Sequence, residues 1–310
     1  MSFSRILITG VNGFFGKHLS TYLLENYPSS EITGIDINKS HGPFRFKFMI
    51  SDITDYDSIK KTIIKTQPNI VFHLAGTFNQ EDLKLLYKTN VIGTENLMKA
   101  STFLTEKTRI ILSSSAAVYG FVTSENNPIK ENTEIRPINH YGISKAAMEM
   151  TGYMYGKEQN NIEIITARTF NLVGYGLSPL LLPGKLAKKI KEGAKTPGEK
   201  KIRVGNINTI RDFCDIKDAV KAFAFLAFKG KKNNVYNIGS GVGRKIKDFI
   251  DTFMMAFDIE GKVIIDRKLF KERDPKKIVA DISKIKIHTG WEPKITLEES
   301  VLNIIKHNLI

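Results

Sequence analysis

The sequence predicts an α/β fold in which a doubly wound parallel sheet carries helices on both faces. Apolar runs of strand length alternate with segments of helical periodicity through the first half of the chain. The helical segments are long enough to form the crossover connections that parallel strands require. A glycine-rich turn also separates the first apolar run from the first helical segment, as expected where a strand passes directly into a helix.

These elements follow one another in a regular order. The expected strands, rich in apolar and β-branched residues, are 5–10, 31–36, 69–76, 109–115 and 162–169. The expected helices are 16–27, 56–66, 83–100 and a further segment that begins near Tyr141. Ligands of parallel sheets bind beyond the carboxyl ends of the strands, so the serine-rich end at 113–115 is a candidate binding edge.

The pattern becomes less regular after Asn171, which predicts a smaller lobe joined to the main sheet. Glycine and proline interrupt the segment from Gly174 to Gly184 five times. We expect the larger domain to comprise residues 1–174 together with about 206–238. The smaller lobe would then comprise about 175–205 and 239–310, interleaved in sequence with the larger domain.

The composition is that of a water-soluble globular protein. Of 310 residues, 42% are hydrophobic and 25% are charged, and no apolar run approaches eighteen residues. The chain starts directly with a strand and shows no targeting segment, so no membrane association is expected. The single Cys214 excludes an internal disulfide and suits the reducing cytoplasm, and no Cys and His cluster predicts a metal site.

The formal net charge of +14 favours an anionic partner, which by charge alone is a nucleic acid, an anionic lipid or a phosphorylated small molecule. The densest basic run, 185–203, has Leu186 and Ile190 at helical spacing, which is typical of a solvated amphipathic helix. No motif combining aromatic and basic residues accompanies it, and this argues against nucleic-acid binding.

The turn after the first strand has the glycine pattern of a dinucleotide site. It contains Gly10, Gly13 and Gly16, with Phe14 and Phe15 between the last two glycines. Glycines at such a turn let a pyrophosphate approach the backbone amides at the start of the helix.

A carboxylate in the expected position supports the dinucleotide site. Asp36 ends the second strand twenty residues after Gly16, where it can accept hydrogen bonds from the adenosine ribose. Because a 2′-phosphate would be repelled there, Asp36 favours NAD(H), although NADP(H) remains open if a cation intervenes.

A second glycine-rich turn competes with the first. Gly239, Gly241 and Gly243 also follow a strand, and Asp266 ends the next expected strand. The spacing of these glycines differs from that of a dinucleotide turn, and Arg244 and Lys245 stand where close helix packing needs a small residue. We therefore favour the first site.

Tyr141 and Lys145 form a candidate acid–base pair because they lie one turn apart on the same face of the expected helix. A phenol has an ordinary pKa of about 10 and needs a neighbouring cation to act as a base near neutral pH. Lys145, together with an oxidised nicotinamide, would lower the pKa of Tyr141, and Ser115 would share the substrate oxygen.

The sequence resembles the extended short-chain dehydrogenase/reductases that act on nucleotide sugars, the NAD-dependent epimerase/dehydratase family. The motifs that carry the resemblance span nearly the whole chain and are TGVNGFFG, VFHLAG, TNVIGTENLM, SSSAAVYG, YGISKAAME, ARTFNLVGYG, RDFCDIKDAVKAF, VYNIGSG and ADISKIKIHTGWEPKITLEES. The resemblance implies a Rossmann-type domain with a small C-terminal substrate-binding lobe, and catalysis by Ser115, Tyr141 and Lys145.

The same resemblance implies further contacts with the cofactor. Asp52 and Ile53 would hold the adenine, while Leu74, Ala75 and Gly76 would line the adenosine and pyrophosphate. Tyr141 and Lys145 would also bind the cofactor through its ribose.

The resemblance also implies where the substrate and a second subunit bind. Asn171, Arg211 and Arg273 would bind the substrate diphosphate, since a guanidinium can donate two hydrogen bonds to one phosphate. A homodimer is implied as well, in which the helix bearing Tyr141 and the apolar segment 83–98 contribute to a four-helix contact.

The local sequence after the serines bears on the reaction. Related sugar 4,6-dehydratases carry Asp and Glu where this chain has Ala116 and Ala117, whose methyl groups exchange no proton, so we expect no elimination of water. The similarity is strongest to the GDP-4-keto-6-deoxymannose reductases and favours NAD(P)H-dependent reduction at C4 of a nucleotide-linked 4-keto-6-deoxyhexose. The alternatives are an NAD-dependent nucleotide-sugar 4-epimerase and, in another class, a non-catalytic NAD-binding regulator or RNA-binding protein on the same fold.

Overall fold

The centre of the molecule is a seven-stranded parallel sheet. In the computed structural model, described for residues 4–39, 45–179, 181, 183–185, 188, 200–258, 261–270 and 275–308, the strand order is β10-β6-β5-β4-β1-β2-β3. The strands are β1 (Arg5–Thr9), β2 (Glu31–Asp36), β3 (Lys47–Ile50), β4 (Ile70–His73), β5 (Thr108–Ser115), β6 (Ile162–Thr169) and β10 (Asn234–Ile238). All neighbours in this sheet pair in parallel, which confirms the predicted fold class.

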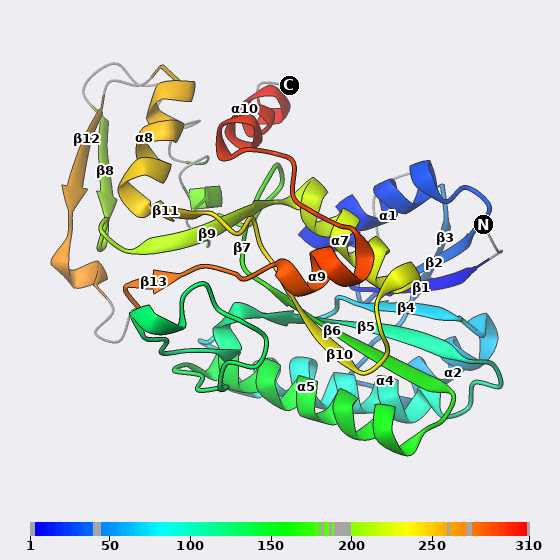
Figure 1. Ribbon diagram of the computed structural model, residues 1–310. Helices are drawn as coiled ribbons and strands as arrows, with labels where there is room; N and C mark the ends of the chain where they lie inside the picture. The colour runs from blue at the N-terminus through cyan, green and yellow to red at the C-terminus, as the bar shows by residue number, and fades with distance from the viewer. Residues whose placement is uncertain are drawn as a thin grey trace.

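Helices cover both faces of the sheet (Figure 1). The first face carries α1 (Phe14–Asn26), α7 (Ile216–Lys229) and α9 (Ser283–Thr289). The second face carries α2 (Tyr56–Thr66), α4 (Gly93–Ser101) and α5 (His140–Glu158).

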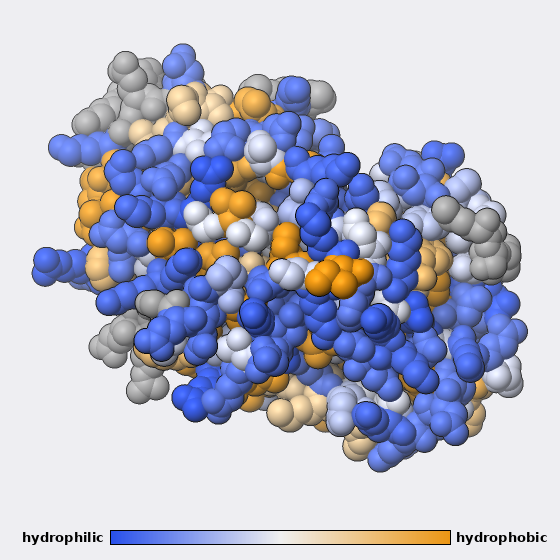
Figure 2. All heavy atoms as spheres, viewed as in Figure 1, coloured by the Kyte–Doolittle hydropathy of each residue, from blue (hydrophilic) through white to orange (hydrophobic). Residues whose placement is uncertain are grey.

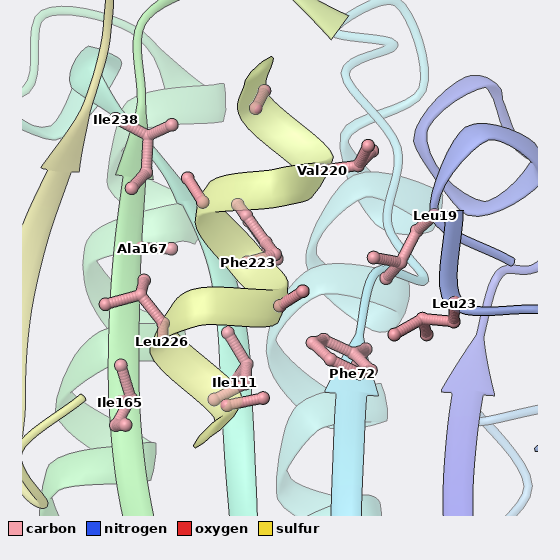
Figure 3. Close-up of a cluster of buried hydrophobic side chains, with 14 of the residues drawn as sticks. Leu19, Leu23, Phe72, Ile111, Ile165, Ala167, Val220, Phe223, Leu226 and Ile238 are labelled. Atoms are coloured by element: carbon pink, nitrogen blue, oxygen red, sulfur yellow. The ribbon is translucent and has the colours of Figure 1, made fainter. Parts of the chain in front are cut away.

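The alternation of strand side chains creates these two cores. In β1, Ile6 and Ile8 point into the first core whereas Leu7 points into the second. Figure 3 shows the first core, where Phe223 and Leu226 of α7 lie over the strands among residues such as Ile111. Each fully buried side chain of this kind contributes about 1.5–3 kcal/mol, so the packing of α7 helps to hold β5 and β6 in place.

The expected helix at 83–100 is divided into three parts. It consists of α3 (Leu83–Tyr87), a single π-helical turn η1 (Lys88–Ile92) and α4. The wider π turn carries Asn90, which is buried, and its amide nitrogen donates to the Thr77 carbonyl (2.8 Å) and the Ser144 hydroxyl (2.9 Å). Helical periodicity alone did not reveal this extra residue in the turn, because the hydrogen bonds that stabilise it come from other elements.

A smaller lobe adjoins the main sheet. Four short strands form its first sheet: β7 (Asn171–Val173), β9 (Ile210–Asp215), β11 (Gly243–Lys245) and β13 (Lys277–Ile278). The strands β8 (Lys200–Val204) and β12 (Gly261–Ile265) form a separate pair. With α8 (Ile246–Ala256) and α10 (Leu297–Asn308), the lobe has a core of its own that includes Phe213, Phe249 and Val301.

Buried aspartates tie the lobe to the main sheet. Asp215, which caps α7, accepts a hydrogen bond of 2.6 Å from Ser300 on α10. Asp218 accepts hydrogen bonds from the backbone amides of Lys294 and Ile295, both at 2.7 Å. The C-terminal segment is thus attached to α7 by carboxylates placed one helical turn apart.

The surface is largely polar. Figure 2 shows hydrophilic side chains over most of the visible face, as the high content of charged residues leads one to expect. Within the described ranges, no helix has the length and apolar character needed to cross a membrane.

Candidate functional site

The glycine-rich turn forms a cradle that admits no side chains. Gly10 has a φ of 68°, and a Cβ atom there would lie 2.8 Å from the backbone of Ala75. A Cβ atom at Gly16 would lie 2.5 Å from the Gly10 oxygen. Gly13 stands directly before α1, so the free amides of the first helical turn face the space beyond the turn.

Two polar groups at this turn fit a dinucleotide. Asp36 is half-buried at the end of β2, where its two oxygens accept the amides of Asn12 (3.0 Å) and Asn38 (3.5 Å). Each carboxylate oxygen retains a lone pair for a ribose hydroxyl. The side-chain oxygen of Asn12 is buried beside it without a hydrogen-bond partner among the described residues, which is expected of a group that meets a ligand.

The other residues expected around the adenosine are brought to the same edge. Asp52 is half-buried and accepts the amide of Thr54 at 2.8 Å. The Ile53 side chain lies in the core, so tightly packed that a Cβ atom at Gly93 would lie 2.6 Å from it. The Ile53 side chain is therefore not available to a ligand, and its backbone oxygen already accepts the side-chain amide of Asn96 at 2.9 Å.

A buried histidine orders the end of β4. The Thr9 hydroxyl lies 2.9 Å from His73 Nδ1 and accepts the amides of Leu74 (3.1 Å) and Ala75 (3.0 Å). Sequence reasoning missed this arrangement, in which one hydroxyl fixes the segment from Leu74 to Gly76 against the glycine turn.

The hydrogen-bond directions fix the tautomer of His73. The Thr94 hydroxyl donates to the Asn90 carbonyl (2.7 Å), so it accepts a proton from His73 Nε2 at 2.9 Å. His73 Nδ1 then accepts from Thr9. Burial lowers the pKa of His73 to about 3, and the nearby Lys145 acts in the same direction, so the ring is neutral near pH 7.

The predicted catalytic residues meet at the end of β5. Asn139 caps α5 by accepting the amide of Gly142 at 2.8 Å, and this places Tyr141 in the first turn. Lys145 lies one turn further, with its ammonium 6.0 Å from the centre of the Tyr141 ring. The ammonium donates a hydrogen bond of 2.7 Å to the Ser113 carbonyl.

The environment shifts the pKa of both side chains. Burial raises the pKa of Tyr141, and the hydrogen bond with Ser115 opposes this shift. Burial lowers the pKa of Lys145 to about 8, and Glu149 opposes this shift. The expected lowering of the Tyr141 pKa is therefore not produced by the protein groups alone, because desolvation of the phenolate dominates.

Ala116 and Ala117 follow Ser115 in a short 3-10 turn, η2 (Ala116–Val118). The amide of Ala117 donates to the Ser115 hydroxyl at 3.2 Å, which orients that hydroxyl. A Cβ atom at Gly142 would lie 2.5 Å from the Ala117 oxygen, so the turn and the start of α5 are in close contact.

Two of the residues expected to bind the diphosphate lie on adjacent strands of the lobe. Asn171 is exposed on β7, and its amide nitrogen donates to the Asp212 carbonyl at 3.0 Å. Arg211 is half-buried on β9 and donates to the Ile210 carbonyl at 2.8 Å. Arg244 of β11 stands directly opposite Arg211, a second cation that sequence reasoning did not assign to the substrate. Arg273 lies outside the described residues.

The competing glycine turn has another role. Its amides at Ser240 (2.7 Å) and Gly241 (2.9 Å) donate to the buried carboxylate of Asp212, which also accepts the amide of Ala280 (3.1 Å). Neither β11, which follows the turn, nor β12, which precedes Asp266, belongs to the main sheet, because β11 pairs with β9 and β12 pairs with β8. This turn therefore binds an internal anion and is not a second dinucleotide site.

Another residue at the reacting end had no signal in the sequence. Thr169 pairs in register with Ser115, and its buried hydroxyl lacks a hydrogen-bond partner within the described structure. For metals, the described ranges contain no group of three or more His, Cys, Asp or Glu side chains arranged to hold an ion.

A family model described as GDP-mannose 4,6 dehydratase matches residues 7–304. The chain belongs to this family. The GDP-6-deoxy-D-mannose reductase of Pseudomonas aeruginosa is 28% identical over 305 residues, covering 97% of this chain and 96% of the relative. These matches confirm the resemblance inferred from the sequence motifs.

Solved structures agree with the fold. The structure of RMD from P. aeruginosa complexed with NADPH has a TM-score of 0.85 at 27% identity, covering 98% of this chain and 96% of that one. The UDP-glucose 4-epimerase of Thermotoga maritima with UDP-glucose has a TM-score of 0.87 at 26% identity, covering 98% and 99%. The glycine cradle, Asp36 and the unpaired oxygen of Asn12 fit a nicotinamide dinucleotide.

Proposed function

We propose that this family member is a nucleotide-sugar oxidoreductase that reduces the C4 keto group of a nucleotide-linked 4-keto-6-deoxyhexose. The observation that carries the proposal is the meeting of Ser115, Tyr141 and Lys145 at the end of β5, beside the glycine cradle of β1. The sequence similarity to the P. aeruginosa reductase over almost the full length of both chains supports the substrate class.

The reaction needs one hydride and one proton. A reduced nicotinamide held at the glycine cradle would supply the hydride to C4 of the sugar. Tyr141 donates its phenolic proton to the oxygen that becomes the hydroxyl, while the Ser115 hydroxyl donates a hydrogen bond to the same oxygen. The raised pKa of Tyr141 suits this direction because the phenol remains protonated until the negative charge develops.

Lys145 has a second task in this proposal. One of its three protons is donated to the Ser113 carbonyl and a second is directed at Met148 Sδ (3.8 Å), so the third is left for the cofactor ribose, while the charge itself supports Tyr141. A protonated Lys145 stabilises the phenolate that remains after proton transfer.

We propose NADH as the preferred coenzyme. Asp36 holds its negative charge at the place where a 2′-phosphate would lie, and the two amides that it accepts keep it there. Since the P. aeruginosa structure contains NADPH, this preference would distinguish the chain from a similar enzyme.

The remaining contacts are proposed from the same arrangement. Asp52 and the Ile53 backbone would hold the adenine, and Leu74, Ala75 and Gly76 would line the path to the pyrophosphate. The substrate diphosphate would bind Asn171 and Arg211, with Arg273 as a further donor. We also propose a division into a larger domain and a substrate lobe. The expected larger domain, residues 1–174 plus about 206–238, would lose β7 and β9 to the lobe, because these two strands pair with each other in the sheet of the lobe.

The second candidate is 4-epimerisation. It is favoured by the structural similarity to the T. maritima 4-epimerase, which was solved with UDP-glucose. Epimerisation starts with the opposite step, in which Tyr141 removes a proton, and its raised pKa opposes that step until an oxidised nicotinamide adds positive charge. Elimination of water is not proposed despite the family description, because Ala116 and Ala117 offer no acid or base.

The two candidates differ in their use of coenzyme. A stoichiometric fall in NADH absorbance with a nucleotide-linked 4-keto-6-deoxyhexose supports the reductase, whereas turnover of a nucleotide hexose without added coenzyme supports the epimerase. Mass spectrometry of compounds that co-purify with the protein identifies the nucleotide directly.

A matched pair of variants tests the site itself. Tyr141→Phe should lower the rate by about 100-fold or more. Tyr56→Phe is the control, because Tyr56 also stands four residues before a lysine, Lys60, but lies on α2. Full activity of Tyr141→Phe would exclude the proposed mechanism.

We further propose a homodimer. Side chains exposed on α3, η1 and α5 form an apolar surface, hereafter the α5 surface, that consists of Leu85, Ile92, Ile143, Met150 and Tyr153. Helices α4 and α5 pack side by side, so the same surface on a second copy would complete a four-helix contact.

A further inference from the structure

A third charged residue continues the line of Tyr141 and Lys145 along α5. Glu149 follows Lys145 by four residues, as Lys145 follows Tyr141, so all three lie on one face of the helix. That face is directed at the end of β5, where each of the three serines makes a different contact. The Ser113 carbonyl accepts Lys145, the Ser114 hydroxyl binds Glu149, and the Ser115 hydroxyl binds Tyr141.

Glu149 is held in place on several sides. Its carboxylate accepts two hydrogen bonds from Arg168 Nε (2.9 and 3.2 Å) and one from Nη2 (2.7 Å). The side chains of Glu149 and Arg168 are only 7% and 4% exposed. A buried ion pair of this kind is costly to desolvate and gives little net stability, so a role other than stability must be considered.

Arg168 is itself immobilised. Its Nη1 donates to the Glu131 carbonyl at 3.0 Å, and its guanidinium lies 4.8 Å from the centre of the Tyr119 ring. Tyr119 in turn donates a hydrogen bond of 2.6 Å to Asn237. Arg168 therefore has fixed partners on several sides, and it holds the Glu149 carboxylate on the helix face that also carries Lys145.

We propose that Glu149 is a positioning residue that keeps Lys145 protonated and aligned with Ser113. This inference rests on the proposed function, in which a charged Lys145 supports proton transfer from Tyr141. The groups around Lys145 come from its own helix, from β4 and from β5. Tyr141 shares its helix, neutral His73 faces it from β4, and the carbonyl of Ser113 comes from β5, so Glu149 supplies the negative charge.

The geometry explains why the charge matters. Lys145 is 6% exposed, and burial disfavours its ammonium form. Glu149 counteracts this loss, whereas a neutral residue in its place would leave Arg168 as a buried cation without its carboxylate. Removing the charge of Glu149 should thus remove its attraction for the Lys145 ammonium. It should also leave the positive charge of Arg168 without the negative charge that offsets it.

The experiment measures the protonation of Lys145 directly in the cofactor-free protein. The protein is labelled with lysine carrying ¹³C at Cε, and the resonance of Lys145 is assigned by its absence in Lys145→Met. Its titration is then followed by NMR in the wild type, in Glu149→Gln and in Glu149→Gln/Arg168→Leu. The double variant leaves no unpaired buried charge and keeps the test decisive if the single variant does not fold.

We expect the Lys145 midpoint to fall by on the order of one pH unit in Glu149→Gln. The double variant should lie between the single variant and the wild type, because the repulsion from Arg168 is also removed. An unchanged or raised midpoint in either folded variant would overturn the inference.

A matched control separates charge from packing. Ser114→Ala removes the hydroxyl that binds Glu149 but leaves both charges, so the midpoint of Lys145 should stay at the wild-type value. An equal fall in Ser114→Ala would show that packing controls the titration, and this too would overturn the inference. Because the NMR titration needs no substrate, its outcome is independent of whether the proposed reduction is found.

Discussion

The ammonium of Lys145 donates a hydrogen bond of 2.7 Å to the backbone oxygen of Ser113. This contact joins the helix that carries Tyr141 to the strand that carries Ser115, and it fixes the distance between the proton donor and the second hydroxyl. A side chain that was expected to supply charge and to bind the cofactor ribose therefore also aligns the two halves of the site.

Reduction should lose rate at high pH because of Lys145. Its pKa is lowered to about 8, so the ammonium is present below that pH and is lost as the pH rises through it. In Lys145→Arg the guanidinium stays charged. The fall in the rate of reduction should therefore occur at higher pH, even though the maximal rate is reduced. Profiles of kcat against pH for both proteins check this prediction. If kcat falls at the same pH in the variant as in the wild type, a group other than Lys145 causes the fall.

His73 should make the fold sensitive to acid. The pKa of His73 is lowered to about 3 in the folded protein, against an ordinary 6.5, so the unfolded chain binds the proton first. The contribution of neutral His73 to the free energy of unfolding is fully present above pH 6.5 and is lost progressively as the pH falls toward 3. Between pH 7 and pH 5 the loss should be about 2 kcal/mol.

Urea unfolding at the two pH values measures the effect of His73. His73→Gln should be less stable at pH 7, because the bridge from Thr9 to Thr94 is weakened, but should lose less stability on acidification than the wild type. His307→Gln, a change at the exposed end of α10, should keep the wild-type loss. Equal losses in His73→Gln and the wild type would contradict the prediction.

Asp36 should control the choice of coenzyme. Asp36→Asn removes the negative charge while preserving the size of the side chain, so NADH loses a charge-assisted hydrogen bond and NADPH loses a repulsion. The ratio of kcat/KM for NADH over NADPH should fall by about 10- to 100-fold. Asp55→Asn, which alters only the cap of α2, should leave the ratio unchanged.

The α5 surface should hold the dimer together. Met150 and Tyr153 are 63% and 60% exposed, and replacing both with Glu would bury four like charges in a symmetric contact. Sedimentation should show a dimer for the wild type and a monomer for Met150→Glu/Tyr153→Glu. Ile287→Glu also replaces an exposed apolar side chain with a charged one, but α9 lies on the opposite side of the sheet. The Ile287→Glu protein should therefore remain a dimer. A monomeric wild type would rule the contact out.

The sequence by itself determined the elements and the local arrangements within them. The alternation of strands and helices predicted the parallel sheet, because a crossover of helical length leaves few other topologies. Gly10, Gly13 and Gly16 located the turn, and the four-residue spacing of Tyr141 and Lys145 placed both on one helix face. These properties depend on residues close together in the chain.

Only the tertiary structure decided which distant residues meet. Glu149 and Arg168 lie nineteen residues apart, and their pairing depends on how α5 packs against β6. Contacts between separate elements likewise produce three other features. These are the π turn at Asn90, the chain of hydrogen bonds through His73 and the hydrogen bonds of the Ser240 loop to Asp212. Such contacts are set by packing and by the need to pair buried polar groups, and no local pattern records them.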